Sequence, residues 1–381
     1  MVKLKNKLEI KDTTAQQKKH WVRLTRVCNN NCLFCLDSEN QNGAIFSLKE
    51  IEADLKKGLA LGARRVVLSG GDPTLHPQLP FIIKKAKKFG YKHIQIITNG
   101  RMLAYGEFAR ELKSAGLDEI TFSLHSHIEA DFEKLTGIKG SYKQALKGLI
   151  NARHLGFIIS VDIVINKINY KKFKETMLFF IALGISEFDL LYLVPFGNAW
   201  RNKKKLFFSP LKAKKYLDQA FALSANKDLY IWTNRLPAVY LENYEHLIQN
   251  PVKLNDDIRG MEKSLKNYII NNIIMDCFGE RCNYCFRQNF CLDLIKLKKE
   301  GVLKSKTAPA CLKQKKLKIE SFKFDKQFDV FKFLGFYINN RYFVKSIKCA
   351  GCSHDGKCEG AWIEDIRKKG FKILNIKNNH G

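Results

Sequence analysis

Three cysteines near the N-terminus constrain this chain more than any other feature. Cys28, Cys32 and Cys35 stand in C-x3-C-x2-C spacing, directly after residues 21–27, in which apolar and polar side chains alternate. Thiolates placed in this way can bind three irons of a [4Fe–4S] cube and leave the fourth iron open. An open iron accepts a further ligand, so this spacing predicts a cluster that takes part in chemistry.

Strand and helix patterns alternate after this triad. Strands are expected at 21–27, 65–68, 92–97, 119–124, 158–165, 187–193 and 229–233, and helices at 46–61, 79–88, 107–115, 142–156, 170–183 and 211–225. Ser47 and Glu50 form a capping box at the start of the first helix. Strand–helix alternation of this kind gives a parallel sheet with right-handed crossovers. Because polar residues follow nearly every strand, we expect an α/β fold, a partial (β/α)6 TIM-like barrel, rather than a doubly wound sheet.

The texture of the sequence changes twice along the chain. Residues 1–19 form a polar, basic lead-in, residues 20–235 carry the alternating pattern, and residues 236–381 are irregular and rich in cysteine. We therefore expect a core domain followed by a small, irregular C-terminal domain.

Residues 20 to about 215 resemble the core of radical S-adenosylmethionine (radical SAM) enzymes. Phe34 stands just before the last cysteine of the triad, and Gly70-Gly71-Asp72-Pro73-Thr74 is similar to the GGEP motif of that superfamily, with Asp in place of Glu. The resemblance implies that SAM chelates the open iron. The reduced cluster then cleaves SAM to methionine and a 5′-deoxyadenosyl radical, which abstracts hydrogen from a substrate.

The resemblance also implies a set of SAM-binding residues. They are Gly70, Gly71, Asp72, Pro73, Asn99, Ser123 and Asn166, all at the ends of expected strands. Loop capping is the alternative role for Ser123 and Asn166, and an ordinary turn is the alternative for Asn99. His125 and His127 are either acid–base groups or bystanders at the same rim, so no catalytic residue is assigned. For the triad itself, the alternative is a zinc site with His20 as the fourth ligand.

The other eight cysteines all follow residue 276. Two C-x2-C-x5-C elements occur there, and each has one further cysteine before it. This region resembles the SPASM or twitch extensions that hold auxiliary clusters, although Ile295 and Trp362 stand where SPASM has a further cysteine. The preferred partition has two [4Fe–4S] clusters, one on Cys277, Cys282, Cys285 and Cys291 and the other on Cys311, Cys349, Cys352 and Cys358. A crossed partition and structural zinc are the alternatives.

The formal net charge is +29, from 66 basic and 37 acidic residues. Such an excess suits an anionic partner such as RNA, but no nucleic-acid-binding motif accompanies it, and a general bias toward Lys, Asn, Ile and Phe is the alternative explanation. No apolar run is long enough for a membrane span, and no signal peptide is visible, so we expect a cytoplasmic protein without a membrane partner.

The expected function is radical chemistry on a substrate, with peptide or protein maturation through thioether or carbon–carbon crosslinks as the first interpretation. Flavodoxin or ferredoxin is the expected electron donor. RNA modification or the biosynthesis of a small-molecule cofactor by the same chemistry is the second interpretation. An iron–sulfur electron carrier or a zinc-stabilised binding protein is the non-enzymatic alternative.

Overall fold

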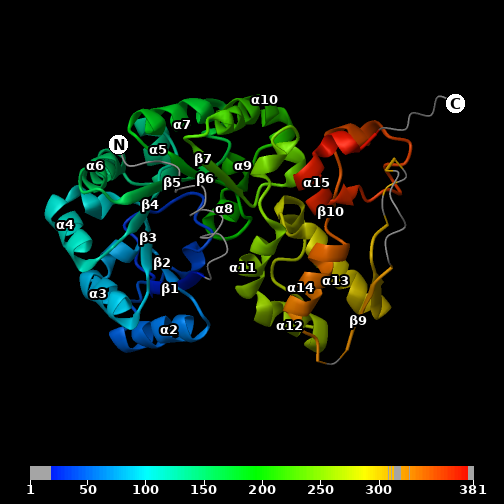
Figure 1. Cartoon of the computed structure of the whole chain (residues 1–381), viewed down its shortest axis with the longest axis horizontal. Coiled ribbons are helices and arrows are strands. Elements are labelled where there is room, and N and C mark those ends of the chain that lie inside the picture. The colour runs from blue at the N-terminus through cyan, green and yellow to red at the C-terminus, as the bar shows by residue number, and fades with distance from the viewer. Residues whose placement is uncertain (1–18, 308, 310, 313–318, 326, 376–381) are drawn as a thin grey trace. The chain divides into compact units, whose positions relative to one another are not determined.

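The computed structural model describes residues 19–307, 309, 311–312, 319–325 and 327–375. The expected lead-in, residues 1–19, therefore lies outside the described residues except for Lys19. The chain divides into two compact units, Met1–Phe208 with Lys215–Ile231, and Ser209–Lys214 with Trp232–Gly381 (Figure 1). None of the described helices is both long and apolar enough to cross a membrane.

The first unit is built on a sheet whose seven strands follow the order of the sequence, from β1 to β7. The strands are β1 Lys19–Thr25, β2 Arg65–Gly70, β3 His93–Thr98, β4 Glu119–Ser123, β5 Ile158–Ile165, β6 Glu187–Tyr192 and β7 Tyr230–Asn234. Each neighbouring pair from β1 to β6 is parallel. In the described chain β1 and β7 are the two edges, so the sheet is an open, partial barrel, and the α/β prediction is confirmed.

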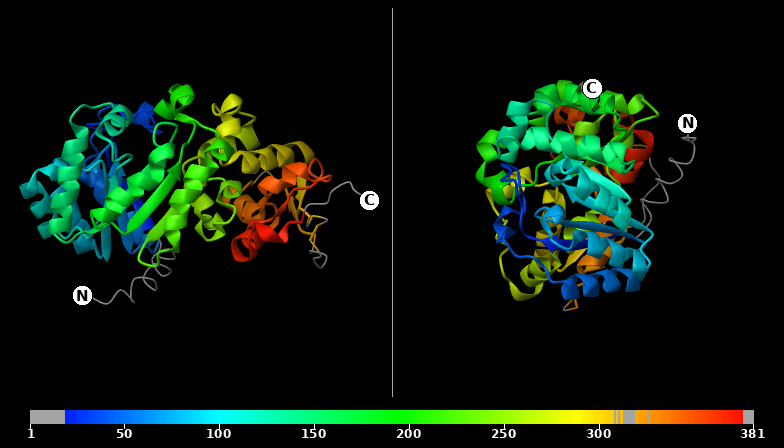
Figure 2. Two further views of the ribbon diagram at one scale, coloured as in Figure 1. Left: turned by 90° about the horizontal axis from the view of Figure 1, so that it is seen from above. Right: turned by 90° about the vertical axis from the view of Figure 1, so that its left-hand side faces the viewer.

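Helices cover the outer side of this sheet (Figures 1 and 2). They are α2 Leu48–Ala60, α3 Leu79–Phe89, α4 Gly106–Ala115, α6 Ser141–His154, α7 Phe173–Ala182 and α10 Pro210–Phe221. The short helices α5 Glu129–Thr136, α8 Gly197–Arg201 and α9 Lys203–Leu206 pack together with residues of the first cysteine loop. The predicted capping box is confirmed, because the Ser47 hydroxyl accepts from the Glu50 N–H and the Glu50 carboxylate accepts from the Ser47 N–H. The sequence did not predict α5, whose apolar face consists of little more than Phe132 and Leu135.

The second unit has a core of its own and is more helical than its sequence suggests. Its helices are α11 Leu254–Arg259, α12 Glu262–Asn271, α13 Gln288–Glu300, α14 Val330–Asn340 and α15 Ile363–Lys369, and its strands are β8 Val302–Lys304, β9 Ser321–Lys323, β10 Phe343–Val344 and β11 Ala361–Trp362. Phe290 packs against Phe333 and Tyr337, with ring centroids 5.4 and 5.3 Å away. A buried, bidentate ion pair between Arg341 and Asp293 joins α14 to α13.

Candidate cofactor site

The loop with the first three cysteines follows β1 and is fixed through its backbone. The last turn of α5 accepts two of its N–H groups, since Asn31 donates to the Thr136 carbonyl oxygen and Leu33 to the Leu135 carbonyl oxygen, both at 2.9 Å. Glycine is required at position 137, where the backbone is left-handed and an added Cβ would lie 2.6 Å from the Asn31 carbonyl oxygen. The cysteine loop therefore has little freedom on this side.

Asn198, at the start of α8, holds the same loop from another direction. Its N–H donates to the Cys35 carbonyl oxygen at 2.9 Å, and its side-chain amide donates to the Cys32 carbonyl oxygen at 3.1 Å. Arg101 adds a third anchor, because its guanidinium donates to the Asn30 side chain at 2.9 Å and to the Asn29 carbonyl oxygen. Neither anchor was predicted from the sequence, although Asn198 directly follows the segment 194–197 at the end of the sixth expected strand.

The three thiols of this loop are partly exposed but lie in poorly solvated surroundings. Burial and the nearby Asp72 carboxylate raise the pKa of Cys28 to about 11. Burial and the two neighbouring thiols raise the pKa of Cys32 well above its usual value, and burial raises that of Cys35. Amide groups approach the sulfurs, with Gln41 Nε2 3.4 Å from Cys35 Sγ and the Asn30 N–H 3.4 Å from Cys28 Sγ. Binding of a cation would stabilise the thiolates, and N–H donors to sulfur suit a thiolate-bound iron–sulfur cluster.

The two glycines that end β2 lie against the start of the cysteine loop. An added Cβ would lie 2.2 Å from the Thr25 carbonyl oxygen at Gly70 and 2.1 Å from the Val27 carbonyl oxygen at Gly71. Two backbone hydrogen bonds join the segments, from Gly71 to Thr25 at 2.8 Å and from Asp72 to Val27 at 2.7 Å. In this structure the glycines are needed so that two backbones can approach each other, a reason that does not depend on SAM.

Asp72 is buried and joins the end of β2 to the end of β3. Its carboxylate accepts from the Thr98 hydroxyl at 2.8 and 2.9 Å, from the Asn99 N–H at 2.8 Å and from the Thr74 N–H at 3.0 Å. Burial raises the pKa of Asp72, while these hydrogen bonds oppose that shift. Pro73 follows at the start of a short 3-10 helix, Pro73–Leu75.

The remaining SAM-binding candidates differ in how far their side chains are already engaged. Asn99 donates to the Asn29 side chain at 2.6 Å and lies 4.0 Å from Cys28 Sγ. Asn166 is fully buried, and its amide bonds to the Val164 carbonyl oxygen and the Ile168 N–H within its own loop. Ser123, the last residue of β4, has no side-chain hydrogen bond that the structure records among the described residues.

The two rim histidines have different surroundings. His125 is fully buried, its Nδ1 accepts from the Val164 N–H at 3.2 Å, and its ring meets Phe34 edge to face at 4.4 Å. Burial lowers the pKa of His125 to about 3, which favours the neutral ring. His127 is paired with the Thr176 hydroxyl at 3.0 Å. His20 is paired with Asp54 at 2.9 Å near the beginning of β1, whereas the cysteine loop follows the other end of that strand.

The first four C-terminal cysteines come together beside the core of the second unit. Cys282 and Cys285 are joined by a backbone hydrogen bond of 3.1 Å, and Cys277 and Cys291 pack against the hydrophobic core. Burial raises the pKa of Cys291 to about 12; the charge of Arg287 opposes this, and the three other thiols add to it. The four thiols are thus close enough to interact electrostatically, and the buried Arg287 acts on them as well.

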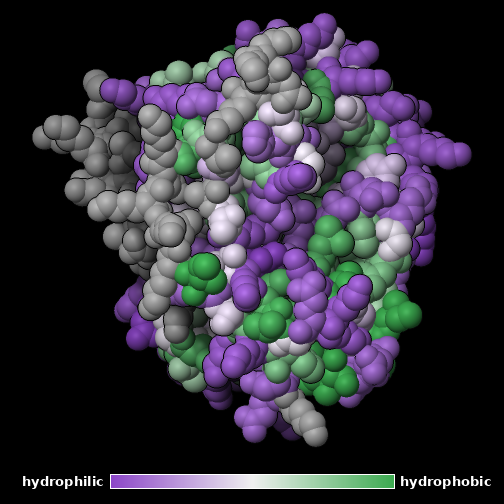
Figure 3. Space-filling view, turned by 90° about the vertical axis from the view of Figure 1, so that its right-hand side faces the viewer, coloured by the Kyte–Doolittle hydropathy of each residue, from purple (hydrophilic) through white to green (hydrophobic). Residues whose placement is uncertain are grey.

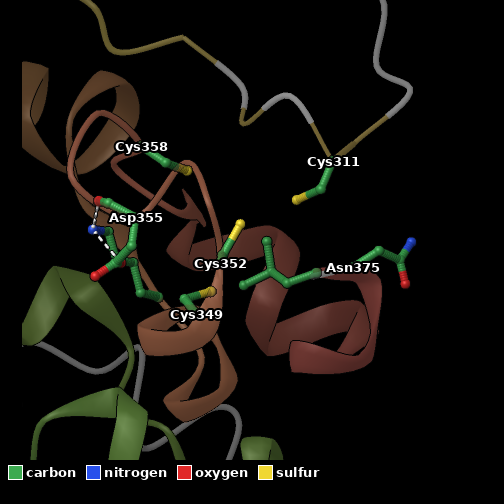
Figure 4. Close-up of a pocket in the computed structure, with 8 residues that line it drawn as sticks. Cys311, Cys349, Cys352, Asp355, Cys358 and Asn375 are labelled. Atoms are coloured by element: carbon green, nitrogen blue, oxygen red, sulfur yellow. Dashed lines mark hydrogen bonds and ion pairs between the residues drawn. The ribbon is translucent and has the colours of Figure 1, made fainter. Parts of the chain in front are cut away.

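The last four cysteines line one pocket (Figure 4). Cys349, Cys352 and Cys358 come from one compact loop, Cys311 comes from a separate segment, and all four sulfurs point into the space between them. Burial raises the pKa of Cys349, and the charges of the other thiols, Cys358 first, add to this rise. Lys345, which also lines the pocket, is paired with Asp355 at 2.8 Å. The structure thus brings Cys311 to the same pocket as the second C-x2-C-x5-C element, and the ligand partition stays a prediction. Within the described chain, no three or more Cys, His, Asp or Glu side chains form a group that could hold a single metal ion.

A buried carboxylate holds the start of the helix that carries Cys349, one of the last four cysteines. Glu242 accepts from the Ser346 hydroxyl at 2.8 Å and from the Ile347 N–H at 3.0 Å, at the start of the 3-10 helix Ile347–Gly351 that carries Cys349. Nothing in the sequence pattern pointed to Glu242, because the contact spans 104 residues.

Comparison with known proteins agrees with this geometry. Residues 22–180 match the family described as the Radical SAM superfamily. Two relatives are named probable GTP 3′,8-cyclase. The one from Sulfolobus acidocaldarius is 35% identical over 46% of this chain and 56% of its own length. The one from Metallosphaera sedula is 36% identical over 46% of this chain and 56% of its own length. The chain thus matches little more than half the length of these relatives.

A solved structure extends the likeness in fold to the C-terminal region. Streptococcus suis SuiB, bound to the precursor peptide SuiA, has a TM-score of 0.50 and 16% identity over 95% of this chain and 75% of its own. Residues 22–180 are thus similar in sequence to the radical SAM domain, and the likeness to SuiB is one of fold.

Proposed function

We propose that the chain is a radical SAM enzyme in which Cys28, Cys32 and Cys35 hold the [4Fe–4S] cluster that binds SAM. The observation that carries this proposal is the convergence of three thiols on a loop that α5, α8 and Arg101 anchor through its backbone. When bound, such a cluster supplies the electron that cleaves SAM to methionine and a 5′-deoxyadenosyl radical, which takes a hydrogen atom from the substrate.

The residues around the cluster position SAM. Gly70 to Pro73 present backbone next to the cysteine loop, and the Ser123 hydroxyl is available to the carboxylate or ribose of SAM. Asn99 lies beside Cys28 and presents a side-chain amide to the same space. Asn166 stabilises the loop that follows β5 through hydrogen bonds of its side-chain amide to the backbone of that loop.

The two groups of four cysteines are proposed to bind two auxiliary [4Fe–4S] clusters. Four thiols gather in each group, and each group has a cation near its sulfurs, Arg287 in the first and Lys345 in the second. Auxiliary clusters of this kind relay an electron or ligate the substrate. The expected donor is flavodoxin or ferredoxin.

Peptide or protein maturation is the first candidate reaction, since a strongly basic chain with auxiliary clusters suits an acidic peptide. A second candidate is the biosynthesis of a cofactor from a nucleotide, favoured by the relatives named probable GTP 3′,8-cyclases. The two candidates share the radical chemistry and differ in the molecule that loses hydrogen.

Anaerobic reconstitution tests the shared chemistry. The proposal requires about twelve irons per chain, four for each cluster, and 5′-deoxyadenosine after addition of SAM and a reductant. Cys32→Ala should remove four irons and all deoxyadenosine, whereas Cys285→Ala and Cys352→Ala should each remove four irons and leave the other eight. Loss of deoxyadenosine from the wild-type chain with a full core cluster would contradict the enzyme proposal.

Mass spectrometry then separates the two substrate classes. Consumption of GTP together with deoxyadenosine would support the nucleotide reaction. If GTP is untouched and a peptide encoded beside the gene loses two mass units, crosslinking is supported instead.

A further inference from the structure

A large basic pocket adjoins the pocket of the last four cysteines. Its cavity is about 650 Å³, and Leu374 and Asn375 line both pockets. Lys348, which precedes Cys349, is part of its lining. Whatever occupies the basic pocket therefore lies beside the second C-terminal group of cysteines.

The lining of this pocket has more cationic than anionic side chains. Five of its lining residues are Lys or Arg, namely Lys348, Arg367, Lys368, Lys369 and Lys372. Two of these are engaged locally, Arg367 with Glu364 at 2.9 Å and Lys369 with Asp365 at 2.7 Å. The other three are exposed, and the described residues give them no ion pair.

The two carboxylates in the lining are already used by the fold. Glu242 accepts from Ser346 and from the Ile347 N–H, as described above, and Glu245 accepts from the Phe371 N–H at 2.9 Å. Their hydrogen bonds stabilise the pocket walls and leave the lysines to face the solvent. Figure 3 shows one face of the molecule, on which hydrophilic and hydrophobic residues are mixed.

We propose that this pocket, with Lys348, Lys368 and Lys372 at its rim, is the docking site of an acidic electron-transfer protein that reduces the cluster held by Cys311, Cys349, Cys352 and Cys358. The inference deepens the proposed function and rests on its auxiliary cluster. Encounters between electron-transfer proteins bury little surface and are steered by complementary charge. A concave basic patch beside a redox centre offers a small contact area and a positive charge that attracts an acidic protein.

The test compares two reductants on the reconstituted, full-length protein. Reduced flavodoxin, an acidic protein, needs the docking site, whereas reduced methyl viologen is a small cation and does not. In stopped-flow measurements, Lys368→Glu with Lys372→Glu should slow flavodoxin-driven reduction at least tenfold at low ionic strength. The same variant should be reduced by methyl viologen at the wild-type rate and should retain all of its iron.

The matched control reverses three exposed lysines of the first unit, Lys49, Lys57 and Lys88, on or at the end of α2 and α3. It changes the net charge by more than the double variant does, so a smaller effect on the flavodoxin rate would assign the loss to the pocket. Salt should slow the wild-type reaction and have little effect on the double variant.

Equal flavodoxin rates for the wild type and the double variant would overturn the proposal. So would a result in which the double variant loses affinity for inorganic triphosphate or for an RNA oligonucleotide while flavodoxin reduces it normally, because the pocket would then bind a different anion. Deoxyadenosine formation driven by methyl viologen separates these outcomes from a failure of the proposed function, since that assay does not involve docking.

Discussion

The hydroxyl of Thr98 donates to the buried carboxylate of Asp72 and so joins the ends of two neighbouring strands behind the first cysteine loop. The backbone of Asp72 meets that loop directly, through the 2.7 Å hydrogen bond from its N–H to the Val27 carbonyl oxygen. Asp72 therefore has a structural role whether or not its backbone also contacts SAM.

Asp72→Asn should weaken this junction. The amide brings an N–H₂ donor to a position where Thr98, Asn99 and Thr74 also donate, so that at least one buried donor loses its acceptor. Such a loss costs about 1–3 kcal/mol. Urea unfolding of the iron-free protein would measure it, with the exposed Asp228→Asn as the control. Equal stabilities of the two variants would contradict the structural role.

Gly71→Ala should disturb the cysteine loop itself. The new Cβ would lie 2.1 Å from the Val27 carbonyl oxygen, a backbone atom that cannot turn away. We expect a destabilisation of about 1–3 kcal/mol, as for other overpacked sites, and a selective loss of the core cluster. Iron analysis would show a deficit of about four atoms per chain. Gly106→Ala is the control, because its nearest neighbours are side-chain atoms at 3.5 and 3.9 Å; a similar deficit there would argue against the explanation.

Local patterns in the sequence predicted much of the first unit. The strand expected at 158–165 is observed at Ile158–Ile165, and the Ser47 capping box is present, because both depend on residues close together in the chain. The anchoring of the cysteine loop could not be predicted in this way. Asn198 and Cys32 are 166 residues apart, and only the folded chain brings them together. For the same reason, spacing suggested the group that contains Cys311 but left the crossed partition open.

The buried carboxylate of Glu119, at the amino-terminal end of β4, should make the free energy of unfolding depend on pH. Glu119 is buried, which raises its pKa, but hydrogen bonding and charge from His93 and the charge of Arg65 outweigh this and lower the pKa below 4.5. The ionised carboxylate therefore contributes stability above about pH 4.5, and this contribution is lost as the pH falls through the lowered pKa.

Unfolding of the iron-free protein at several pH values would test this. Glu119→Gln should be less stable than the wild type at pH 7, and the difference should shrink on acidification. The exposed Glu107→Gln should follow the wild-type curve. A constant difference between Glu119→Gln and the wild type at all pH values would refute the linkage.

Arg287 should raise the reduction potential of the first auxiliary cluster. It is buried and held by the Asp257 carbonyl oxygen and the Met261 sulfur, and its charge acts on Cys277 and Cys291. A reduced cluster carries one more negative charge than the oxidised one, so a nearby cation stabilises the reduced form. Arg287→Met should therefore lower the potential by tens of millivolts, since about 59 mV corresponds to a tenfold change for one electron. A redox titration followed by electron paramagnetic resonance would measure the shift, and Lys299→Met, exposed on the same helix α13, should leave the potential unchanged. If both variants shift equally, burial of the charge near the thiols is not the cause.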